Sequence, residues 1–469
     1  MTADARALPS CAPQEAQPLS LWHDQLPEEP VRPPLPGSTQ ADVVIVGAGY
    51  TGLWTAYYLA KADPSLRVVV LESQVAGFGA SGRNGGWCSA LFPASWHRLA
   101  RVAGRPAAVA MQHALQDAVA EVGRVADREG IDCHFALGGA VELARGPAQL
   151  RRAEAEVREA RSFGLGADTL DLLSAPAARE QLQARGVLGA LRTDHCATLH
   201  PGLLVRGLAR AVERLGVVVH EGTTVHRTSP GAVHTDRGTV TADVVLLATE
   251  GFTAALPGHR RDLAPVYSLM LATEPLPPEV WEQIGLRDRQ AFNDLRHLTI
   301  YGQRTADDRI AFGGRGAPYH FASRTDPSYE RVEAVHTGLW NSLVDLLPQV
   351  ADAQVTHRWG GNLGVPRDWF PSVGLDRQSG TAWAGGYVGD GVATSQLAGR
   401  TLADLVTGAD TDRTHLPWVR RRRARWEPEP LRWIGVNAVT ALMTRADRAE
   451  ARSGQPSRMA AGFWKALGQ

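Results

Sequence analysis

Apolar residues gather in short runs along the chain, and the first of these runs predicts a strand–helix–strand unit. Residues 41–46 are a short, β-branched apolar run, which is typical of a parallel strand buried on both faces. Residues 53–62 then carry apolar side chains at helical spacing. Residues 66–71 form another apolar run, so we expect a second strand after the helix.

A complete G-x-G-x-x-G joins the first predicted strand to the helix. Gly47 would allow a tight turn, Gly49 would let the backbone approach a pyrophosphate, and Gly52 would let the helix pack closely on the strand. Glu72 ends the second strand, 20 residues after Gly52, where a carboxylate can bind both hydroxyls of an adenosine ribose. This order predicts a dinucleotide site, with a coincidental strand–turn–helix as the alternative. The acid at position 72 argues against NADP.

The same order of elements returns near the end of the chain. Residues 381–384 predict a strand, 385–392 a glycine-rich turn, and 394–406 a helix. A nucleotide domain assembled from discontinuous segments would explain this recurrence. Elsewhere the pattern predicts helices over 105–130, 148–185, 201–215 and 327–347, strands over 140–144, 217–221, 243–249, 263–276 and 309–314, and turn-bounded segments at 358–361 and 370–374.

Residues 77–87 (GFGASGRNGGW) form a loop too rich in glycine for a helix or strand. Such a loop can run backbone N–H groups along a flat ring, and Arg83 and Asn84 offer further donors. The alternative is a surface Ω-loop that binds no ligand.

Composition narrows the function classes. The 469 residues suggest two or three domains, and the contents of 44% apolar and 21% charged residues are ordinary for a soluble globular protein. The formal net charge of +0 gives no overall attraction to nucleic acid, and the arginines at 420–423 are followed by Glu427 and Glu429, which favours a solvated helix face. Four separated cysteines, without CxxC or a Cys/His cluster, predict neither disulfides nor a metal site. We expect a cytoplasmic protein without a secretion signal or membrane span.

Several of these motifs together resemble the D-amino-acid-oxidase-like family of FAD-dependent oxidoreductases. They are the GxGxxG with Glu72, the GASGRNGG loop, the helix start at residues 200–202, DVVLLAT at 243–249 and the late GGYVGDGVATS. The long arm before the first strand, the GASGRNGG string and the segment 301–315 are most similar to the gamma-glutamylputrescine oxidase group. The resemblance covers about residues 20–410.

The resemblance implies an α/β fold with a GR2-type, Rossmann-like FAD-binding domain in discontinuous segments and a second α+β substrate domain on an antiparallel sheet. The expected divisions are an extended arm over 1–40, an FAD-binding domain over 41–100, 195–262 and 356–412, a substrate domain over 101–194 and 263–355, and a helical extension over 413–469.

The resemblance also implies FAD and assigns residues to it. Gly47, Gly49 and Gly52 would lie at the diphosphate, Glu72 at the ribose and the Val225 backbone at adenine. Ala80, Ser81, Arg83, Asn84, Gly85 and Gly86 would lie along the ribityl chain and isoalloxazine, and Gly361, Gly386, Gly389, Val392 and Ala393 would close over its pyrimidine end. Some sarcosine oxidases of the family tether the flavin through a late cysteine. Because no cysteine follows Cys196, we expect non-covalent FAD.

The implied reaction is oxidation of a C–N bond in an amine or amino acid, with oxygen or a quinone as the acceptor. The turn at 385–392 and the helix after it would offer donors to the reduced flavin. The proposed catalytic residues are Tyr267, Tyr301, Trp359 and Arg315, and further candidates for substrate contact are Trp87, His200, Arg304 and Tyr387. For the aromatic residues the alternative is packing, for His200 a helix cap, and for the arginines surface charge.

Other functions remain open at this stage. They are a tRNA-base-modifying flavoprotein of the same fold, a non-catalytic flavin-binding subunit, and a dehydrogenase that uses free NAD. The neutral chain argues against the first of these. The sequence does not reveal the amine, the acceptor, the oligomeric state or the role of the C-terminal extension.

Overall fold

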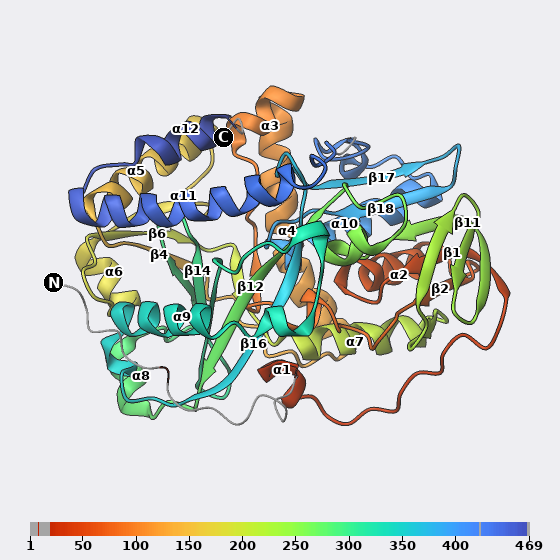
Figure 1. Cartoon of the computed structure of the whole chain (residues 1–469), viewed down its shortest axis with the longest axis horizontal. Helices are drawn as coiled ribbons and strands as arrows, with labels where there is room; N and C mark the ends of the chain where they lie inside the picture. Colours follow the sequence, from red (N-terminus) through yellow and green to blue (C-terminus); the bar gives the residue numbers. More distant parts are fainter. Residues whose placement is uncertain (1–7, 9–18, 422–423, 467–469) are drawn as a thin grey trace.

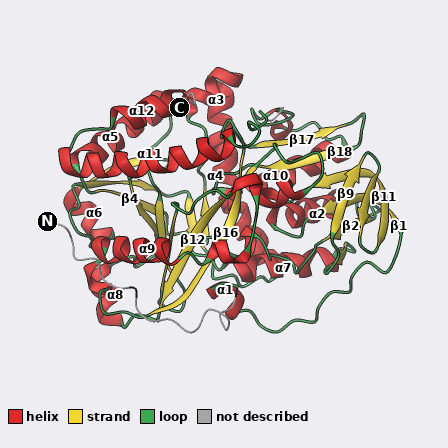
Figure 2. Cartoon of the chain, in the orientation of Figure 1, coloured by secondary structure: helices red, strands yellow, loops and turns green. Residues whose placement is uncertain are grey.

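The computed structural model describes residues 8, 19–421 and 424–466. Residues 1–7 and 9–18 of the predicted arm over 1–40, and two arginines of the run 420–423, therefore lie outside the described residues. Two large sheets are the framework of the fold, one at each end of the view in Figure 1. Helices pack against both sheets (Figure 2). This arrangement confirms the predicted α/β class with two sheets.

The first sheet contains the predicted nucleotide unit. Its main path runs β17-β18-β11-β1-β2-β8, and the five strands from β18 to β8 are parallel. β17 is antiparallel to β18, and β9 and β10 form an antiparallel ribbon on β11. The strands span Thr39–Val46 (β1), Val68–Leu71 (β2), Val218–His220 (β8), Val225–Ser229 (β9), Ala232–Thr235 (β10), Gly238–Leu247 (β11), Ser372–Asp376 (β17) and Thr381–Gly385 (β18).

Alternate residues of β1 enter two different cores, which explains its continuous apolar run. Val43 and Ile45 pack with the helices on one face, whereas Val44 and Val46 pack with Val233 of the β9–β10 ribbon on the other. The helices that share the first core are α2 (Tyr50–Ala62), α4 (Arg105–Glu129), α7 (Pro201–Arg214) and α10 (Gly391–Thr407).

The helices that follow the early and late glycine turns pack closely together. A Cβ atom at Gly399 of α10 would lie 2.6 Å from the Cβ of Trp54 in α2, so glycine permits this approach. The strands before the two turns, β1 and β18, are separated only by β11. The fold therefore brings segments more than 300 residues apart to one edge of the sheet.

The second sheet has the order β16-β12-β15-β14-β13-β4-β6-β5 and is antiparallel except where β13 meets β4. It confirms the predicted antiparallel sheet. Its strands span Ala140–Ala144 (β4), Asp171–Ser174 (β5), Gly189–Thr193 (β6), Ala264–Thr273 (β12), Ala291–Asp294 (β13), Ile300–Arg304 (β14), Ile310–Gly314 (β15) and Val355–Val365 (β16). The remaining elements are α1 (Leu21–Asp24), β3 (Trp87–Ser89), α3 (Trp96–Ala103), α5 (Pro147–Ser162), α6 (Ala175–Gln181), β7 (Cys196–Thr198), α8 (Pro278–Ile284) and α9 (Glu333–Leu346).

Three local predictions were wrong. Residues 358–361 are part of β16 and not a turn-bounded segment, since they pair with β12. Gly360 permits close packing there, because a Cβ at this position would come within 2.4 Å of Leu269 on β12. The helix predicted over 148–185 ends at Ser162, and β5 follows before α6 begins. The helix predicted from residue 327 begins only at Glu333, after a short 3₁₀ turn.

The domain boundaries stay a prediction, but two segments lie differently from the predicted grouping. β16, grouped with the first domain, pairs with β12 in the second sheet. The helix α4, grouped with the second domain, shares a core with α2 and α10.

The C-terminal extension is helical, with α11 over Leu431–Ser453 and α12 over Arg458–Ala466. Figure 1 shows α11 beside α5, on the side of the second sheet. Asp447 of α11 accepts the backbone N–H groups of His297 and Leu298 at 2.7 and 2.9 Å. Within the described ranges, no helix is long and apolar enough to span a bilayer.

Candidate functional site

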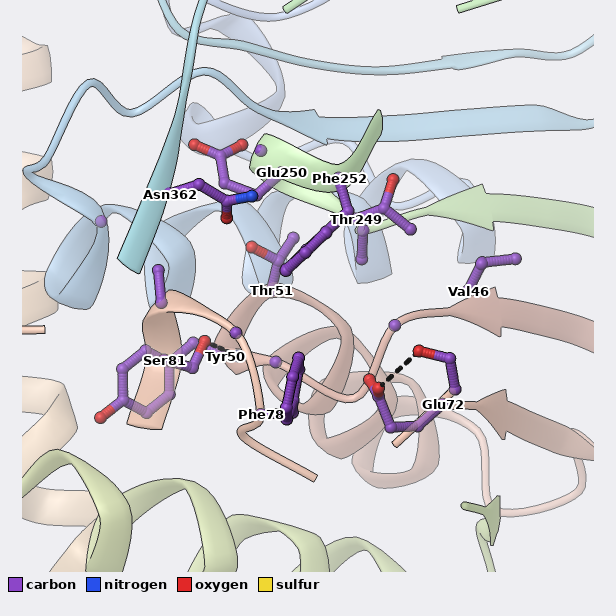
Figure 3. A pocket seen from close by; sticks show the side chains of 18 of the residues that line it. Val46, Tyr50, Thr51, Glu72, Phe78, Ser81, Thr249, Glu250, Phe252 and Asn362 are labelled. Atoms are coloured by element: carbon purple, nitrogen blue, oxygen red, sulfur yellow. Dashed lines mark hydrogen bonds between the residues drawn. The ribbon is translucent and has the colours of Figure 1, made fainter. Parts of the chain in front are cut away.

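A cavity of about 380 Å³ opens at the carboxyl ends of the parallel strands of the first sheet (Figure 3). Several segments that are far apart in the sequence line it together. They are residues 46–51, 71–74, 78–84, 223–225, 248–256, 362–363 and 387–395, each in part.

The early glycine turn forms one wall of this cavity. Gly47 has a φ of +107°, and a Cβ there would lie 2.7 Å from the carbonyl oxygen of Ala248. A Cβ at Gly52 would lie only 2.0 Å from the carbonyl oxygen of Gly47, so α2 can pack against the turn only with glycine at this position. α2 then begins at the cavity wall, with the positive end of its dipole there.

Glu72 lies at one end of the cavity, directly after β2 (Figure 3). Its carboxylate accepts the backbone N–H groups of Ala48 and Gln74, each at 3.0 Å. Burial raises the pKa of Glu72, and these two hydrogen bonds oppose the rise. Val225 lines the same cavity from the start of β9.

The side chain of Asn84 holds the glycine-rich loop in shape. It donates to the carbonyl oxygens of Ala80 and Ser81 at 3.1 and 3.0 Å, and its own oxygen accepts the N–H of Gly86 at 2.8 Å. The Ser81 hydroxyl oxygen in turn accepts the N–H of Tyr50, in the first turn of α2, at 2.9 Å. The loop and the early glycine turn are thus connected before any ligand binds.

Arg83 points away from the cavity. Its guanidinium donates to the carbonyl oxygen of Phe78 at 2.6 Å, lies 4.5 Å from the centre of the Phe78 ring, and forms an ion pair with Glu330. Arg83 therefore links the glycine-rich loop to Glu330, which precedes α9.

Glu250, to which the sequence analysis assigned no role, holds the late glycine turn. Its carboxylate accepts the N–H of Gly386 at 2.8 Å and the N–H of Tyr387 at 3.2 Å. Gly389 in this turn has a φ of +114°, a conformation that a residue with a side chain rarely adopts. The Tyr387 hydroxyl lies 3.0 Å from the hydroxyl of Thr51 in α2, so a hydrogen bond joins the late turn to the early one.

The predicted cofactor residues divide into two sets. Nine line the cavity: Gly47, Gly49, Glu72, Ala80, Ser81, Asn84, Val225, Gly389 and Val392. Seven do not: Gly52, Arg83, Gly85, Gly86, Gly361, Gly386 and Ala393. Sequence reasoning missed the lining residues Phe78, Thr249, Glu250, Phe252 and Asn362. Glu250 carries a recognisable signal, because it follows a buried parallel strand as Glu72 does.

None of the four predicted catalytic residues lines the cavity, but two contact its surrounding loops. Tyr301 packs against Gly85, where a Cβ would lie 2.6 Å from the tyrosine ring, and its hydroxyl lies 2.8 Å from the Ser268 hydroxyl. Trp359 is buried in a cluster with Trp22, and its indole N–H donates to the carbonyl oxygen of Arg83 at 2.9 Å.

The other two lie beyond these loops. Tyr267 accepts the N–H of Asp326 at 3.2 Å, and burial raises its pKa to about 12. Arg315 is half-buried and donates to the carbonyl oxygen of Val388 in the late glycine turn. Burial raises the pKa of the nearby Asp390 to about 6, although the charge of Arg315 opposes the rise.

Two further candidates have structural partners. His200 is the N-cap of α7, where its Nδ1 accepts the N–H of Leu203 at 3.0 Å, and burial lowers its pKa to about 4. The helix-cap alternative for His200 is thus confirmed. Arg304 pairs with Asp308 at 2.6 Å and lies over the ring of Trp281. The guanidinium of Arg304 thus has a carboxylate partner within the chain, and binding of a substrate carboxylate by Arg304 stays a prediction.

The cavity has the features that a dinucleotide cofactor requires. An acidic side chain stands at one end, helix N-termini of α2 and α10 face it, and glycines keep its walls free of side chains. A Cβ at Gly49 would lie 2.9 Å from the Ser81 hydroxyl and would crowd the wall between the turn and the loop. The residues present therefore fit FAD.

The fold and this cavity define a dinucleotide-binding α/β protein, and comparison with known proteins identifies its family. The family model described as FAD dependent oxidoreductase (DAO) matches residues 42–405. The chain belongs to this family, and FAD is its cofactor. The resemblance inferred from the sequence is confirmed.

Individual relatives agree with this assignment. The chain is 31% identical to a probable oxidoreductase OrdL of Rhizobium meliloti, over 83% of this chain and 89% of the relative. It is 30% identical to gamma-glutamylputrescine oxidoreductase of Escherichia coli, over 79% and 84% of the two chains. The crystal structure of glycine oxidase from Geobacillus kaustophilus superposes with a TM-score of 0.67 at 23% identity, covering 82% of this chain and 99% of that one.

Proposed function

We propose that this enzyme oxidises the C–N bond of an amine or amino acid, with oxygen or a quinone as the final acceptor. The observation that carries the proposal is the convergence of the early turn, the 78–84 loop and the late turn on one cavity. The names of relatives support the substrate class, since they include gamma-glutamylputrescine oxidoreductase, glycine oxidase and D-amino acid dehydrogenase.

We assign the binding of FAD to groups on the cavity wall. Glu72 would bind the adenosine ribose, and the N-terminus of α2 would bind the diphosphate. The late turn and the N-terminus of α10 would offer backbone donors to the flavin ring. Bound there, FAD would supply the acceptor for a hydride from the carbon next to the amine nitrogen, and water would hydrolyse the resulting imine.

The chain's own side chains position the substrate rather than carry the redox step. Tyr301 stands on β14, beside the glycine-rich loop that would hold the flavin, and Tyr267 stands on β12 of the same sheet. Trp359 and Arg315 support those loops through Arg83 and Val388. We therefore propose Tyr301 and Tyr267 as substrate-facing residues, and Trp359 and Arg315 as positioning residues.

We also propose that FAD is held without a covalent bond. No cysteine follows Cys196 in the sequence, and Cys88, Cys133 and Cys196 do not line the cavity. Acid precipitation of the purified enzyme should leave the flavin in the supernatant. A yellow precipitate would contradict non-covalent binding.

An anaerobic amine panel tests the proposed reaction. The purified holoenzyme is mixed with primary amines, N-methylated amino acids and D-amino acids, and flavin absorption is followed. At least one class of amine should bleach the flavin on the time scale of a single turnover. If every class leaves the flavin oxidised, the proposed reaction is wrong, and a non-catalytic flavin-binding subunit becomes the better description.

A further inference from the structure

A second cavity, of about 370 Å³, lies next to the glycine-rich loop and has no role in the reaction proposed above. Trp87, the last residue of that loop, is part of the cavity wall. The other walls come from residues 89–95, from α3, α4, β4 and α5, and from the segments around residues 169 and 194.

The lining combines carboxylates with aromatic rings. Glu142 enters from β4, and Glu156 and Glu159 enter from α5. Trp87 and Trp96 are among the aromatic residues on the walls. Among the described residues, no lysine or arginine lines this cavity. Its chemistry therefore suits a cation with an apolar body, because carboxylates and aromatic faces both attract ammonium groups.

Glu156 is the residue that points most directly to a ligand. It is half-buried and lines the cavity, and within the described part of the chain its carboxylate has no hydrogen-bond or ion-pair partner. Burial raises its pKa to about 8, with Glu142 and Glu159 adding to the rise and Arg152 opposing it. Ionising a carboxyl group that lines an enclosed cavity without a partner is costly, so a bound cation would complete this site.

The second cavity adjoins the first through shared neighbours. The Trp87 ring meets the Tyr301 ring edge to face at 6.5 Å, and Tyr301 packs on Gly85 of the loop. On another side, the charge of Glu142 contributes to the raised pKa of Asp390, the residue that precedes α10. The two cavities share no lining residue, so a substrate that occupied both would pass Trp87 and Tyr301.

We propose that the second cavity binds the remote ammonium group of a di- or polyamine whose other amino group is oxidised at the flavin. This inference rests on the function proposed above and narrows its substrate class. The acidic lining disfavours a substrate whose far end carries a carboxylate, because like charges would meet in a cavity without arginine or lysine.

The kinetic test compares amines that differ only at the far end. The holoenzyme and its Glu156→Gln variant are assayed with butylamine, 1,4-diaminobutane and spermidine. Glu154→Gln is the matched control, because Glu154 lies on the same helix, reaches only Arg158 at 4.0 Å and does not line the cavity.

We expect Glu156→Gln to raise KM for 1,4-diaminobutane and spermidine roughly 10-fold or more, as for loss of a hydrogen bond to a charged group. Its kcat, and both constants for butylamine, should stay close to wild type. An equal change for butylamine and the diamine, or no change for either, would overturn the cavity proposal while the amine oxidation stands. Failure of every amine to bleach the flavin would overturn both.

A binding measurement separates this role from a structural one. Calorimetry of dithionite-reduced holoenzyme with 1,4-diaminobutane is run at pH 7 in buffers of different ionisation enthalpy. Because the Glu156 carboxyl holds its proton at this pH, binding of the diamine should release part of a proton. The charged or titratable groups facing Glu156 are Glu142 from β4, Arg152 and Glu159 from α5, and His195 from the loop after β6.

The proton release should disappear in Glu156→Gln and persist in Glu154→Gln. Release of the same size in Glu156→Gln would show that another group binds the diamine, and the assignment to Glu156 would then be wrong.

Discussion

The walls of the two cavities are formed by different groups of the chain. The first is shaped by backbone, with Gly47 and Gly389 at positive φ and helix N-termini facing inward. The second is shaped by side chains, with Glu142, Glu156 and aromatic rings on its walls. A backbone site depends on which residues have no side chain, whereas a side-chain site depends on charge. Substitutions should therefore damage the two cavities in different ways.

The largest effect should come from adding one methyl group to the backbone-built cavity. Gly52→Ala would place a Cβ 2.0 Å from the carbonyl oxygen of Gly47, so α2 must move away from the turn. We expect a loss of FAD binding and a destabilisation of about 3 kcal/mol. The visible spectrum and thermal unfolding measure both.

Gly338→Ala is the matched control for this change. Gly338 lies within α9, and a Cβ there would meet nothing within 4 Å. This variant should keep its FAD and gain a little stability, since alanine favours helix. If Gly52→Ala also keeps its full flavin content, the shape of the first cavity does not depend on glycine.

A smaller effect is expected where a side chain supports the backbone-built cavity. Glu250→Ala removes the acceptor for two N–H groups of the late glycine turn. Loss of hydrogen bonds to a charged group costs about 1.5–3 kcal/mol, so the affinity for FAD should fall roughly 10- to 100-fold. Titration of the apoenzyme with FAD, followed by flavin fluorescence, measures the change. Glu282→Ala, at an exposed position of α8, should bind FAD like wild type.

The second cavity should make the stability of the protein depend on pH. The pKa of Glu156 rises from 4.5 to about 8 on folding, so the folded state binds the proton more tightly than the unfolded state does. Without a bound cation, the stability of the protein should therefore fall as pH rises from about 4.5 to 8. Relative to wild type, Glu156→Gln should gain Tm steadily over this range and level off above it. Glu154→Gln should show no such trend, and a flat difference for Glu156→Gln would contradict a buried, unpaired carboxylate.

The smallest effect concerns the contact between the early and late turns. Thr51→Val removes the hydroxyl that lies 3.0 Å from the Tyr387 hydroxyl. We expect a destabilisation of about 1 kcal/mol, typical of one hydrogen bond. A double-mutant cycle with Tyr387→Phe should show coupling between the two positions. Strictly additive effects would indicate that the hydrogen bond does not join the turns.

The sequence predicted the parts of the fold that depend on local pattern. The strand–turn–helix around Gly47–Gly52 and the helix after the late turn could be predicted because their spacing alone defines them. Arg83 could not be placed in this way, since its partner Glu330 lies 247 residues away in the chain. The strand β16 was missed because its glycines read as turn residues, whereas they permit close packing in a sheet.

The second cavity could not be predicted from the sequence either. Glu142 lies in a short apolar strand and Glu156 in a charged helix, and neither pattern indicates a binding site. Their meeting beside Trp87 depends on how β4 and α5 pack against β3 and α4. Burial and missing partners, which single out Glu156, are properties of the folded chain.

The most direct test of the account is the visible absorption spectrum of the purified enzyme and of Gly52→Ala, recorded before and after addition of FAD. The account predicts a flavin band at about one FAD per chain in the wild-type enzyme and little or none in the variant. A folded wild-type protein that is colourless and takes up no added FAD would contradict the claim that the separated glycine turns hold one flavin.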